Sequence, residues 1–471
     1  MKRKLSNVTL LGIDCVNVER LQAAMDVSMK DIEFGAVKLL TSLPTTDTHL
    51  VPIPHIGSVE EYSRFIIEDL YKYVDTEFVL VIQYDGFILN PKSWSDEFLK
   101  YDYIGSPWLV RDWSVKNFAF PKNSVGSKIV GNGGFSIRSR KILDVGAQLA
   151  REGKIPKVHP EDVAICVWHR DLFEKEGVKF APAELAEKFS YEGEEWTYAC
   201  QFGFHGLSWT NLDDWITGHP EYDFIVDEYR KARKDRFIGR MTRAREKILN
   251  NTINVFKDKA IEAHTFGSVG RGDSDELSDI DIWFTYKDSD IKDVLAKRME
   301  LYSEIGEIVH LCEPPQNAPI DGVHSFVLYK TEVGLLQVDL YLCPQSTSFL
   351  TKDSKKIFSE IDLPRMELSL NPNRVLFNKD YRIDFVIFIA FIAIKKLARN
   401  KSDALGDLLK EYGFLSEKYG IKVNNLEANA QSFAIYFQIL SNIKNVSNSK
   451  QFNALAKIEK FARTVEYIKG L

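Results

Sequence analysis

The sequence predicts an α/β protein of two or three domains. The chain has 471 residues, which is too many for one ordinary hydrophobic core. Before about residue 225, short apolar runs alternate with amphipathic helical patterns, which is typical of a mostly parallel sheet that helices cover on both faces. A basic helical segment, further strands and a helical C-terminal region follow, and this change of pattern indicates a second domain.

The composition excludes several classes of protein. Apolar residues make up 45% of the chain and charged residues 27%, as in soluble globular proteins rather than in disordered or fibrous ones. A net charge of -6 gives no overall bias toward nucleic acid or a membrane surface. The cysteines, 5 in all, form no C-x-x-C pair, so we expect a reduced, cytoplasmic protein without a structural zinc site.

Two segments of the chain have an apolar run of the kind found in membrane-directed sequences. At the N-terminus, Asp14 interrupts the apolar run too early for a secretory signal, so Val8 to Ile13 is predicted to be a first buried strand. The run FVIFIAFIAI, from Phe385 to Ile394, lies between Asp384 and Lys395 and is too short to span a bilayer. We therefore expect a core helix there and no membrane-spanning segment.

Residues 227–255 form a strongly basic helical pattern that connects the two parts of the chain. Its apolar residues recur at helical spacing, so one stripe is expected to pack while the rest is solvated. This stripe consists of Phe237, Met241, Ala244 and Ile248. The basic side chains either bind phosphates or form a solvated face, and the second interpretation is favoured because most such runs are solvated.

The stretch TFGSVGRGDSDELSDIDIWFTY, residues 265–286, carries the most specific pattern. Side chains change face at every residue of a strand, so Asp279 and Asp281 point to one face while Ile280 and Ile282 point to the other. Two neighbouring carboxylates repel each other, and a divalent cation held between them relieves this repulsion. The alternative, an acidic surface loop after a glycine turn, does not explain the alternation.

Three further residues complete the pattern of a nucleotide site. Gly267 has no side chain, which lets backbone amides approach a triphosphate closely, and Ser268 supplies a hydroxyl. The later run LLQVDLYL places Asp339 on a strand that we expect beside the first. Three carboxylates around two magnesium ions would activate an attacking hydroxyl and stabilise the departing pyrophosphate.

This pattern resembles the nucleotidyltransferase superfamily of DNA polymerase beta, whose smaller members include the aminoglycoside and the minimal nucleotidyltransferases. The resemblance covers roughly residues 240–345. It implies that Asp279 and Asp281 bind Mg2+ and that Asp339 completes the metal site and acts as base. The nucleotide-binding residues that it implies are Gly267, Ser268 and Arg271. An inactive relative that keeps the fold is the alternative, and the presence of every expected residue argues against it.

The first half of the chain carries five shorter blocks. In EFVLVIQYDGFIL, an apolar strand delivers Asp85 at its carboxyl end, where open α/β sheets bind ligands. The other blocks are YDYIGSPW (101–108), VGNGGFSIRSRK (130–141), HPEDVAICVWHR (159–170) and FGFHGLSW (202–209). Each block is weak evidence alone, and only their order along the chain makes them informative.

Taken in order, the blocks resemble nucleotide-sugar glycosyltransferases of the GT-A fold, in particular a poorly characterised glycosyltransferase-like family. The match spans most of residues 5–215 and extends to the fringe-type β-1,3-glycosyltransferases. It implies a Mn2+ or Mg2+ ion that Asp85 and His205 hold against the diphosphate of the donor. Gln83 stands where the family has the first aspartate of Asp-x-Asp, which leaves the need for this metal open.

The remaining residues of these blocks have local alternatives. By resemblance the glycines let a sugar nucleotide pass close to the backbone, although a hairpin or bulge explains them equally well. These glycines are Gly131, Gly133 and Gly134. Glu161 and Asp162 follow Pro160, where acidic residues commonly begin a helix. By resemblance one of the two acidic residues is the base of an inverting transfer, and Asp162 is the preferred candidate. Three tryptophans either stack on sugars or pack in the core, namely Trp108, Trp196 and Trp209.

The sequence thus predicts a bifunctional transferase in bacterial surface-polysaccharide or glycoconjugate synthesis. Its regions are a GT-A-like domain with a Rossmann-like mixed sheet (1–226), an α+β nucleotidyltransferase domain (227–350) and a helical region that completes it (351–471). We expect a nucleotide sugar, a nucleoside triphosphate and a glycan or glycoconjugate acceptor as partners, and no nucleic acid. Two other hypotheses stay open: an antitoxin-like minimal nucleotidyltransferase that modifies or restrains a partner macromolecule, and an N-terminal half that only binds sugar nucleotides.

Overall fold

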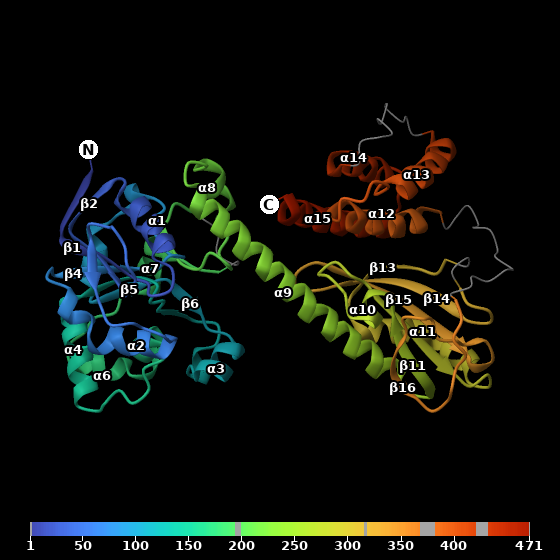
Figure 1. The fold of residues 1–471 in the computed structure, drawn as a ribbon, viewed down its shortest axis with the longest axis horizontal. Coiled ribbons are helices and arrows are strands. Elements are labelled where there is room, and N and C mark those ends of the chain that lie inside the picture. Colours follow the sequence, from blue (N-terminus) through green and yellow to red (C-terminus); the bar gives the residue numbers. More distant parts are fainter. Residues whose placement is uncertain (1, 194–198, 315–317, 368–381, 421–431, 471) are drawn as a thin grey trace. The chain divides into compact units, whose positions relative to one another are not determined.

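The computed structural model describes residues 2–193, 199–314, 318–367, 382–420 and 432–470. The chain forms two compact units, Met1–Arg233 and Lys234–Leu471 (Figure 1). Each unit contains a six-stranded sheet together with helices. The fold class is therefore mixed α/β, as the sequence predicts, and each unit is described by itself below.

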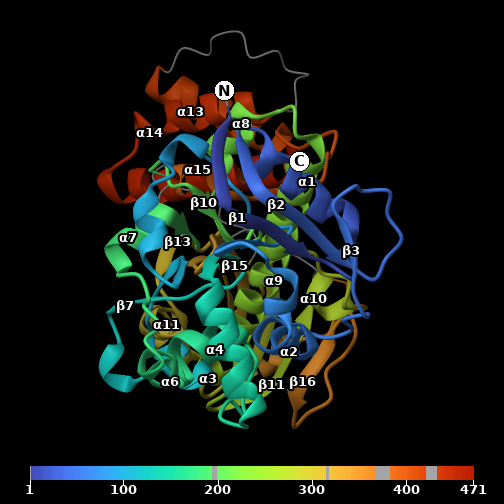
Figure 2. The ribbon, with the colours of Figure 1, turned by 90° about the vertical axis from the view of Figure 1, so that its left-hand side faces the viewer.

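The sheet of the first unit has the strand order β3-β2-β1-β4-β8-β5. Its first four strands run parallel, whereas β8 is antiparallel to both of its neighbours. Figure 2, in which this unit faces the viewer, shows β1 and β2 side by side. The strands are β1 (Arg3–Ile13), β2 (Ile32–Thr41), β3 (Leu50–Pro52), β4 (Phe78–Ile82), β5 (Tyr103–Gly105) and β8 (Phe135–Ser139).

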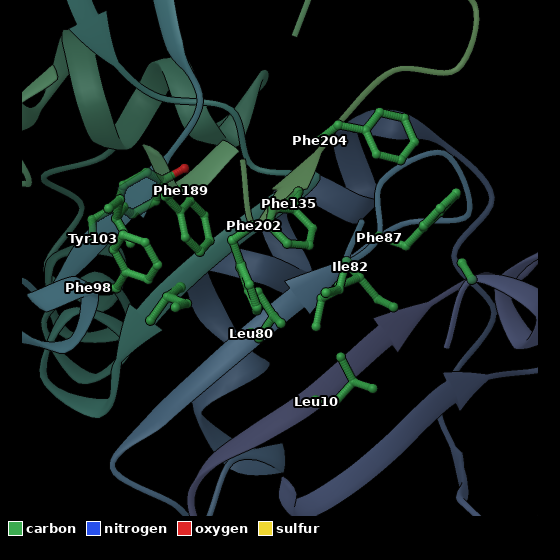
Figure 3. Packing of buried hydrophobic residues seen from close by; sticks show 14 of the residues in the cluster. Leu10, Leu80, Ile82, Phe87, Phe98, Tyr103, Phe135, Phe189, Phe202 and Phe204 are labelled. Atoms are coloured by element: carbon green, nitrogen blue, oxygen red, sulfur yellow. The ribbon is translucent and has the colours of Figure 1, made fainter. Parts of the chain in front are cut away.

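Both faces of this sheet are buried, because helices and loops cover each side. Leu10, Leu80 and Ile82 point to a face that is covered mainly by aromatic side chains (Figure 3). Leu11 and Val79 point to the opposite face, which packs against α2 (Val59–Glu68) and α4 (Arg140–Arg151). Two-sided burial explains why the strand FVLVI is apolar at every position.

Shorter elements of this unit carry or flank several of the predicted site residues. Two small two-stranded sheets pair β6 with β7 and β9 with β10. These strands are β6 (Pro107–Leu109), β7 (Lys128–Val130), β9 (Ser190–Tyr191) and β10 (Gly203–Phe204). The helices of the unit, besides α2 and α4, include α1 (Val18–Met29), α3 (Asp112–Phe118), α5 (Glu161–Val163), α6 (Arg170–Lys175), α7 (Ala183–Phe189) and α8 (Asp213–Gly218).

The helix α9 (Asp223–Phe256) contains the basic segment that the sequence marks as a connector. Near its start, Tyr229 is buried in the core of the first unit. Further along, Phe237 and Met241 belong to the core of the second unit. The two compact units divide between residues 233 and 234, inside this helix.

The sheet of the second unit has the order β13-β14-β15-β12-β11-β16. Only the central pair β12 and β15 runs parallel, and every other neighbouring pair is antiparallel. The strands are β11 (Ala260–Phe266), β12 (Ile280–Tyr286), β13 (Ile308–Cys312), β14 (Val323–Lys330), β15 (Leu335–Pro344) and β16 (Lys355–Ser359).

The C-terminal helices share a core with this sheet, since Phe326 and Leu328 of β14 pack in the same cluster as Val386 and Ile387. The expected core helix at 385–394 lies within α12, and no helix in the described ranges is long and apolar enough to cross a membrane. The helices of the unit after α9 are α10 (Gly267–Arg271), α11 (Ile291–Ile305), α12 (Arg382–Ala398), α13 (Gly406–Tyr419), α14 (Phe433–Lys444) and α15 (Ser449–Gly470).

Candidate functional sites

The predicted carboxylates of the second unit lie on its two central strands. Asp279 directly precedes β12, and Asp281 lies on that strand. Asp281 is paired in register with Asp339 of the parallel strand β15. In-register residues of neighbouring strands project to the same face, so the structure brings the three carboxylates together as the sequence suggests.

This concentration of negative charge perturbs Asp281 most strongly. Burial and the carboxylates of Asp339 and Asp279 hold the pKa of Asp281 well above its usual value. A carboxyl group in such surroundings carries its negative charge at a cost in free energy, and a neighbouring cation lowers that cost. A cation bound next to Asp281 would therefore stabilise the charged form of this carboxylate.

Lys395 of α12 supplies one positive charge and was not singled out from the sequence as a site residue. Its ammonium nitrogen lies 2.5 Å from Oδ2 of Asp279 and 2.7 Å from Oε1 of Gln337, and the residue is 5% exposed. In the sequence this lysine only marks the end of an apolar run. A cationic side chain on a helix that otherwise packs in the core was the signal that could have identified it.

The Asp339 carboxylate is held by two other side chains. Oδ1 of Asp339 lies 2.8 Å from Nε2 of His324, and Oδ2 accepts a hydrogen bond from the amide of Gln337. Gln337 precedes Asp339 by two residues on β15, so both side chains point to one face. Lys395 on α12 therefore bonds directly to Asp279 and is linked through Gln337 to Asp339.

The glycine turn before these strands has a steric cause. Gly267 has a φ of +62°, and a Cβ atom at this position would lie 2.2 Å from Oδ2 of Asp281. Only glycine therefore lets the turn approach the carboxylate so closely. Ser268 follows in the short helix α10, while Arg271 forms ion pairs with Asp273 at 3.1 Å and with Asp353 at 2.9 Å.

The donor set of this site suits a divalent cation, because Mg2+ prefers oxygen ligands such as carboxylates. Asp279, Asp281 and Asp339 would hold the ion. Several of their oxygens are already bonded to Lys395, Gln337 and His324. Within the described ranges, no three His, Cys, Asp or Glu side chains form a ready-made metal-binding group.

The predicted site of the first unit gathers around His205. Its Nε2 atom lies 3.5 Å from Oδ1 of Asp85 and 3.1 Å from Oε1 of Gln83, both of which follow β4. Its Nδ1 atom lies 3.2 Å from Oε1 of Glu192 and 3.1 Å from the amide nitrogen of Asn132. Neither Glu192 nor Asn132 was identified from the sequence as part of the site.

His205 and Asp85 each stabilise the charged form of the other. Burial opposes a charge on His205, but Asp85 and Glu192 hold the pKa of the imidazole well above its usual value. Burial also disfavours the charged form of Asp85, yet His205 holds the pKa of that carboxyl below its usual value. Oδ1 of Asp85 is buried and has no hydrogen-bond partner in the described part of the chain, so this oxygen suits a cation, which His205 joins as a ligand only in its neutral form.

The two acidic residues after Pro160 have different surroundings. Glu161 is buried and lies 3.3 Å from the guanidinium of Arg138, which ties it into the core. Asp162 accepts hydrogen bonds from the backbone N–H of Gly133 at 3.0 Å and of Val163 at 2.8 Å. Burial and the neighbouring Glu161 raise the pKa of Asp162 to about 7. Of the two, Asp162 is therefore the better base near neutral pH.

The glycines between β7 and β8 make room for protein side chains. A Cβ at Gly133 would lie 1.9 Å from Oε1 of Glu161, and one at Gly134 would lie 2.0 Å from Nε2 of His205. At Gly131, a Cβ would lie 2.1 Å from the ring of Trp108. Because Gly133 and Gly134 are adjacent, these contacts place Glu161, the neighbour of Asp162, close to His205. The predicted residues of the first unit therefore lie in one cluster.

Two of the three predicted tryptophans lie in the described part of this site. Trp108 is half-buried, and its ring centroid is 5.7 Å from that of Phe120. Trp209 is exposed and donates a hydrogen bond from its indole nitrogen to Oε1 of Glu192 at 2.9 Å. Trp196 lies outside the described residues.

Comparison with protein families distinguishes the two units. Residues 45–205 match a family described as "Protein of unknown function (DUF5672)". Residues 249–314 match a family described as "Nucleotidyltransferase domain". The second unit thus contains a nucleotidyltransferase domain, a class that generally uses divalent metal ions. Among curated protein sequences, none matches the chain.

Comparison with solved structures finds distant likenesses. The galactosyltransferase LgtC, in complex with donor and acceptor sugar analogues, is 13% identical over 47% of this chain and 95% of its own, with a TM-score of 0.27. The bifunctional IspDF from Campylobacter jejuni is 14% identical over 37% of this chain and 48% of its own, with a TM-score of 0.24. The match thus spans about half of the length of IspDF.

A cyclic dinucleotide synthase, CdnE from Elizabethkingia meningoseptica with GTP and Apcpp, is 12% identical over 48% of this chain and 90% of its own. Its TM-score is 0.17. Likenesses at these levels assign no function to the chain.

Proposed function

We propose that the chain is a bifunctional transferase. The first unit transfers a sugar from a nucleotide sugar to an acceptor hydroxyl, and the second transfers a nucleotidyl group from a nucleoside triphosphate. The observation that supports the second activity is the in-register pairing of Asp281, which lies in the matched nucleotidyltransferase segment 249–314, with Asp339 of the neighbouring strand. The observation that supports the first is the cluster of Asp85, His205 and Asp162, which come from distant parts of the sequence.

In the sugar transfer, Asp162 accepts the proton of the acceptor hydroxyl, whose oxygen forms the new bond to the anomeric carbon. The bond from that carbon to the nucleoside diphosphate breaks, and its electron pair leaves on the diphosphate oxygen. A pKa of about 7 suits this base to neutral pH. A divalent cation, when bound at Asp85 and His205, would stabilise the charge of the leaving diphosphate.

In the nucleotidyl transfer, Asp339 accepts the proton of the attacking hydroxyl, and its contacts with His324 and Gln337 support this role by fixing the carboxylate. The hydroxyl oxygen bonds to the α-phosphorus, and pyrophosphate leaves with the electron pair of the broken bond. Lys395 keeps Asp279 in place beside the strand. Magnesium, when bound by the three aspartates, would supply the Lewis acid for this step.

Surface-polysaccharide or glycoconjugate assembly in a bacterial cytoplasm is the setting that we propose. Such assembly consumes both activated sugars and nucleoside triphosphates, and all five cysteines are free thiols, as expected in a reducing compartment. A thermal-shift screen of nucleotide sugars and nucleoside triphosphates, each with Mg2+ and Mn2+, tests the proposal. It predicts metal-dependent stabilisation by both classes of ligand. Stabilisation by neither class would contradict it.

A further inference from the structure

A pocket of about 430 Å³ opens beside Asp162 in the first unit. Its walls come from β6, α3, α5 and the segments that follow β9 and β10. This volume falls within the range of about 300–1,000 Å³ that is common for small-molecule sites. The aromatic residues of its lining are Trp108, Trp113, Phe118, Phe120 and Trp209.

The position of the pocket distinguishes two sides of the proposed sugar-transfer site. Asp162 and Glu192 line the pocket, whereas Asp85 and His205 do not. The cation-binding pair, which would face a diphosphate, therefore lies outside the pocket, and the base lies at its edge. A molecule in this pocket is placed to present a hydroxyl to Asp162 without occupying the diphosphate position.

Two indole rings at this pocket are exposed although they are large and apolar. Trp113 is 63% exposed and Trp209 is 38% exposed. Neighbouring groups hold both rings: Trp113 contacts Phe118 edge-on at 5.2 Å between centroids, and Trp209 donates to Glu192. Fixed, exposed indoles beside a polar group suit a ligand that has an apolar face and polar edges.

The charges of the pocket restrict the occupant further. Two carboxylates, Asp162 and Glu192, line it together with one cation, Arg111. A phosphate or carboxylate group in the pocket would meet like charges at short range, which disfavours its binding. A neutral ligand with hydroxyl groups meets no such cost and donates hydrogen bonds to the carboxylates.

We propose that this pocket binds the acceptor as a neutral saccharide. Its pyranose rings stack on Trp113 and Trp209, and the reacting hydroxyl faces Asp162. The C–H face of a pyranose ring packs on an indole by dispersion and burial, while its hydroxyls stay hydrogen-bonded. This inference rests on the proposed sugar transfer and specifies the acceptor class for that reaction.

Saturation-transfer NMR on the full chain tests the inference without any donor. The probes are methyl glycosides of glucose, galactose and N-acetylglucosamine, the disaccharides lactose and cellobiose, and the anionic glucose 6-phosphate. We expect at least one neutral probe to bind, and Trp113→Ala and Trp209→Ala each to weaken that binding at least about tenfold, as for other stacked indoles. The control Lys116→Ala, which changes an exposed residue of α3 outside the pocket, should leave it unchanged.

Three results would overturn the inference: no neutral probe binds, binding survives in both tryptophan variants, or glucose 6-phosphate binds more tightly than the neutral glucoside. Nucleotide-sugar binding by Trp113→Ala, measured by thermal shift, is a separate readout and should stay within about twofold of wild type. Failure of every nucleotide sugar to bind wild type would overturn the proposed sugar transfer instead. The two proposals therefore fail in distinguishable ways.

Discussion

Asp162 combines three properties that a general base needs. It is half-buried at the edge of a pocket, two backbone N–H groups fix its orientation, and its pKa is raised to about 7. An ordinary aspartate at pH 7 is a weak base, so burial and the neighbouring Glu161 change its chemistry rather than its position. The pH dependence of sugar transfer is therefore informative.

We predict that Asp162→Asn lowers the rate of sugar transfer about 10²- to 10⁴-fold while donor binding is kept. In the wild type the rate should rise with pH through about 7, because Asp162 accepts a proton only when it is ionised. Glu161→Gln removes a neighbouring negative charge and should shift this midpoint to lower pH. Initial rates between about pH 5.5 and pH 8.5 measure both effects. Full activity of Asp162→Asn would exclude it as the base.

Loss of the negative charge of Asp281 is predicted to abolish activity but to increase the stability of the fold. The folded-state pKa of Asp281 is raised, so the protonated form is favoured on folding, and ionisation at neutral pH destabilises the native state. Asp281→Asn should abolish nucleotidyl transfer and raise the melting temperature by about 2–4 °C, the shift that about 1 kcal/mol gives in a domain of this size. Calorimetry at pH 7 without metal checks this result. Unchanged turnover would rule out the assignment of the site.

At the scale of elements, the strands that carry chemistry were predictable because their patterns are local. Alternation identified the face of Asp279 and Asp281, and apolar neighbours identified the strand of Asp339. Lys395 was not predictable as a partner, because it lies 116 residues from Asp279 and belongs to a helix read only as core. Glu192 was not predictable for a similar reason, since no local sequence pattern links it to His205.

The order of the strands in the sheet could not be predicted from the sequence pattern either. A mostly parallel sheet was expected for the first unit, and β1 to β4 fulfil this expectation. The sequence did not show which strand of the sheet runs antiparallel, because an apolar run buried on both faces reads alike in either direction. Short strands such as β6 and β9 carry too few residues for a recognisable period.

The contact between α12 and the central strands yields a prediction with a matched control. Lys395→Met leaves Asp279 without its cation, so the melting temperature should fall, by an amount that corresponds to at most about 3 kcal/mol. Nucleotidyl transfer should also fall, because Asp279 loses its position. Lys396→Met changes the next residue, whose ion pairs with Asp403 and Asp407 are more exposed, and should cost less than about 1 kcal/mol. Equal effects of the two substitutions would contradict the role of Lys395.

At the scale of the whole molecule, the position of the domain boundary is open to test. The sequence places it after residue 226, whereas the compact units divide after residue 233. The difference matters because Tyr229 is buried in the first unit and its hydroxyl donates to Asp213 at 2.7 Å. A fragment that ends at 226 lacks this anchor.

We predict that fragments 1–233 and 234–471 each fold on their own. Fragment 1–226 should be less stable than 1–233 by about 3 kcal/mol or more, as for the loss of a buried aromatic side chain. Urea unfolding followed by circular dichroism measures the difference. Aggregation of both longer fragments, with a stable full chain, would show that the two units do not fold independently.

The central claim is that one chain holds two separate transferase sites. Product release from a mixture of nucleotide sugar, nucleoside triphosphate, metal and a neutral saccharide tests it most directly in the variants Asp85→Ala and Asp281→Asn. The hydroxyls of the saccharide and of water accept the transferred groups, and ion-exchange chromatography separates the products. We predict that Asp85→Ala loses release of nucleoside diphosphate and keeps release of pyrophosphate, and that Asp281→Asn shows the reverse. Loss of both products in either variant, or of neither in both, would contradict the account.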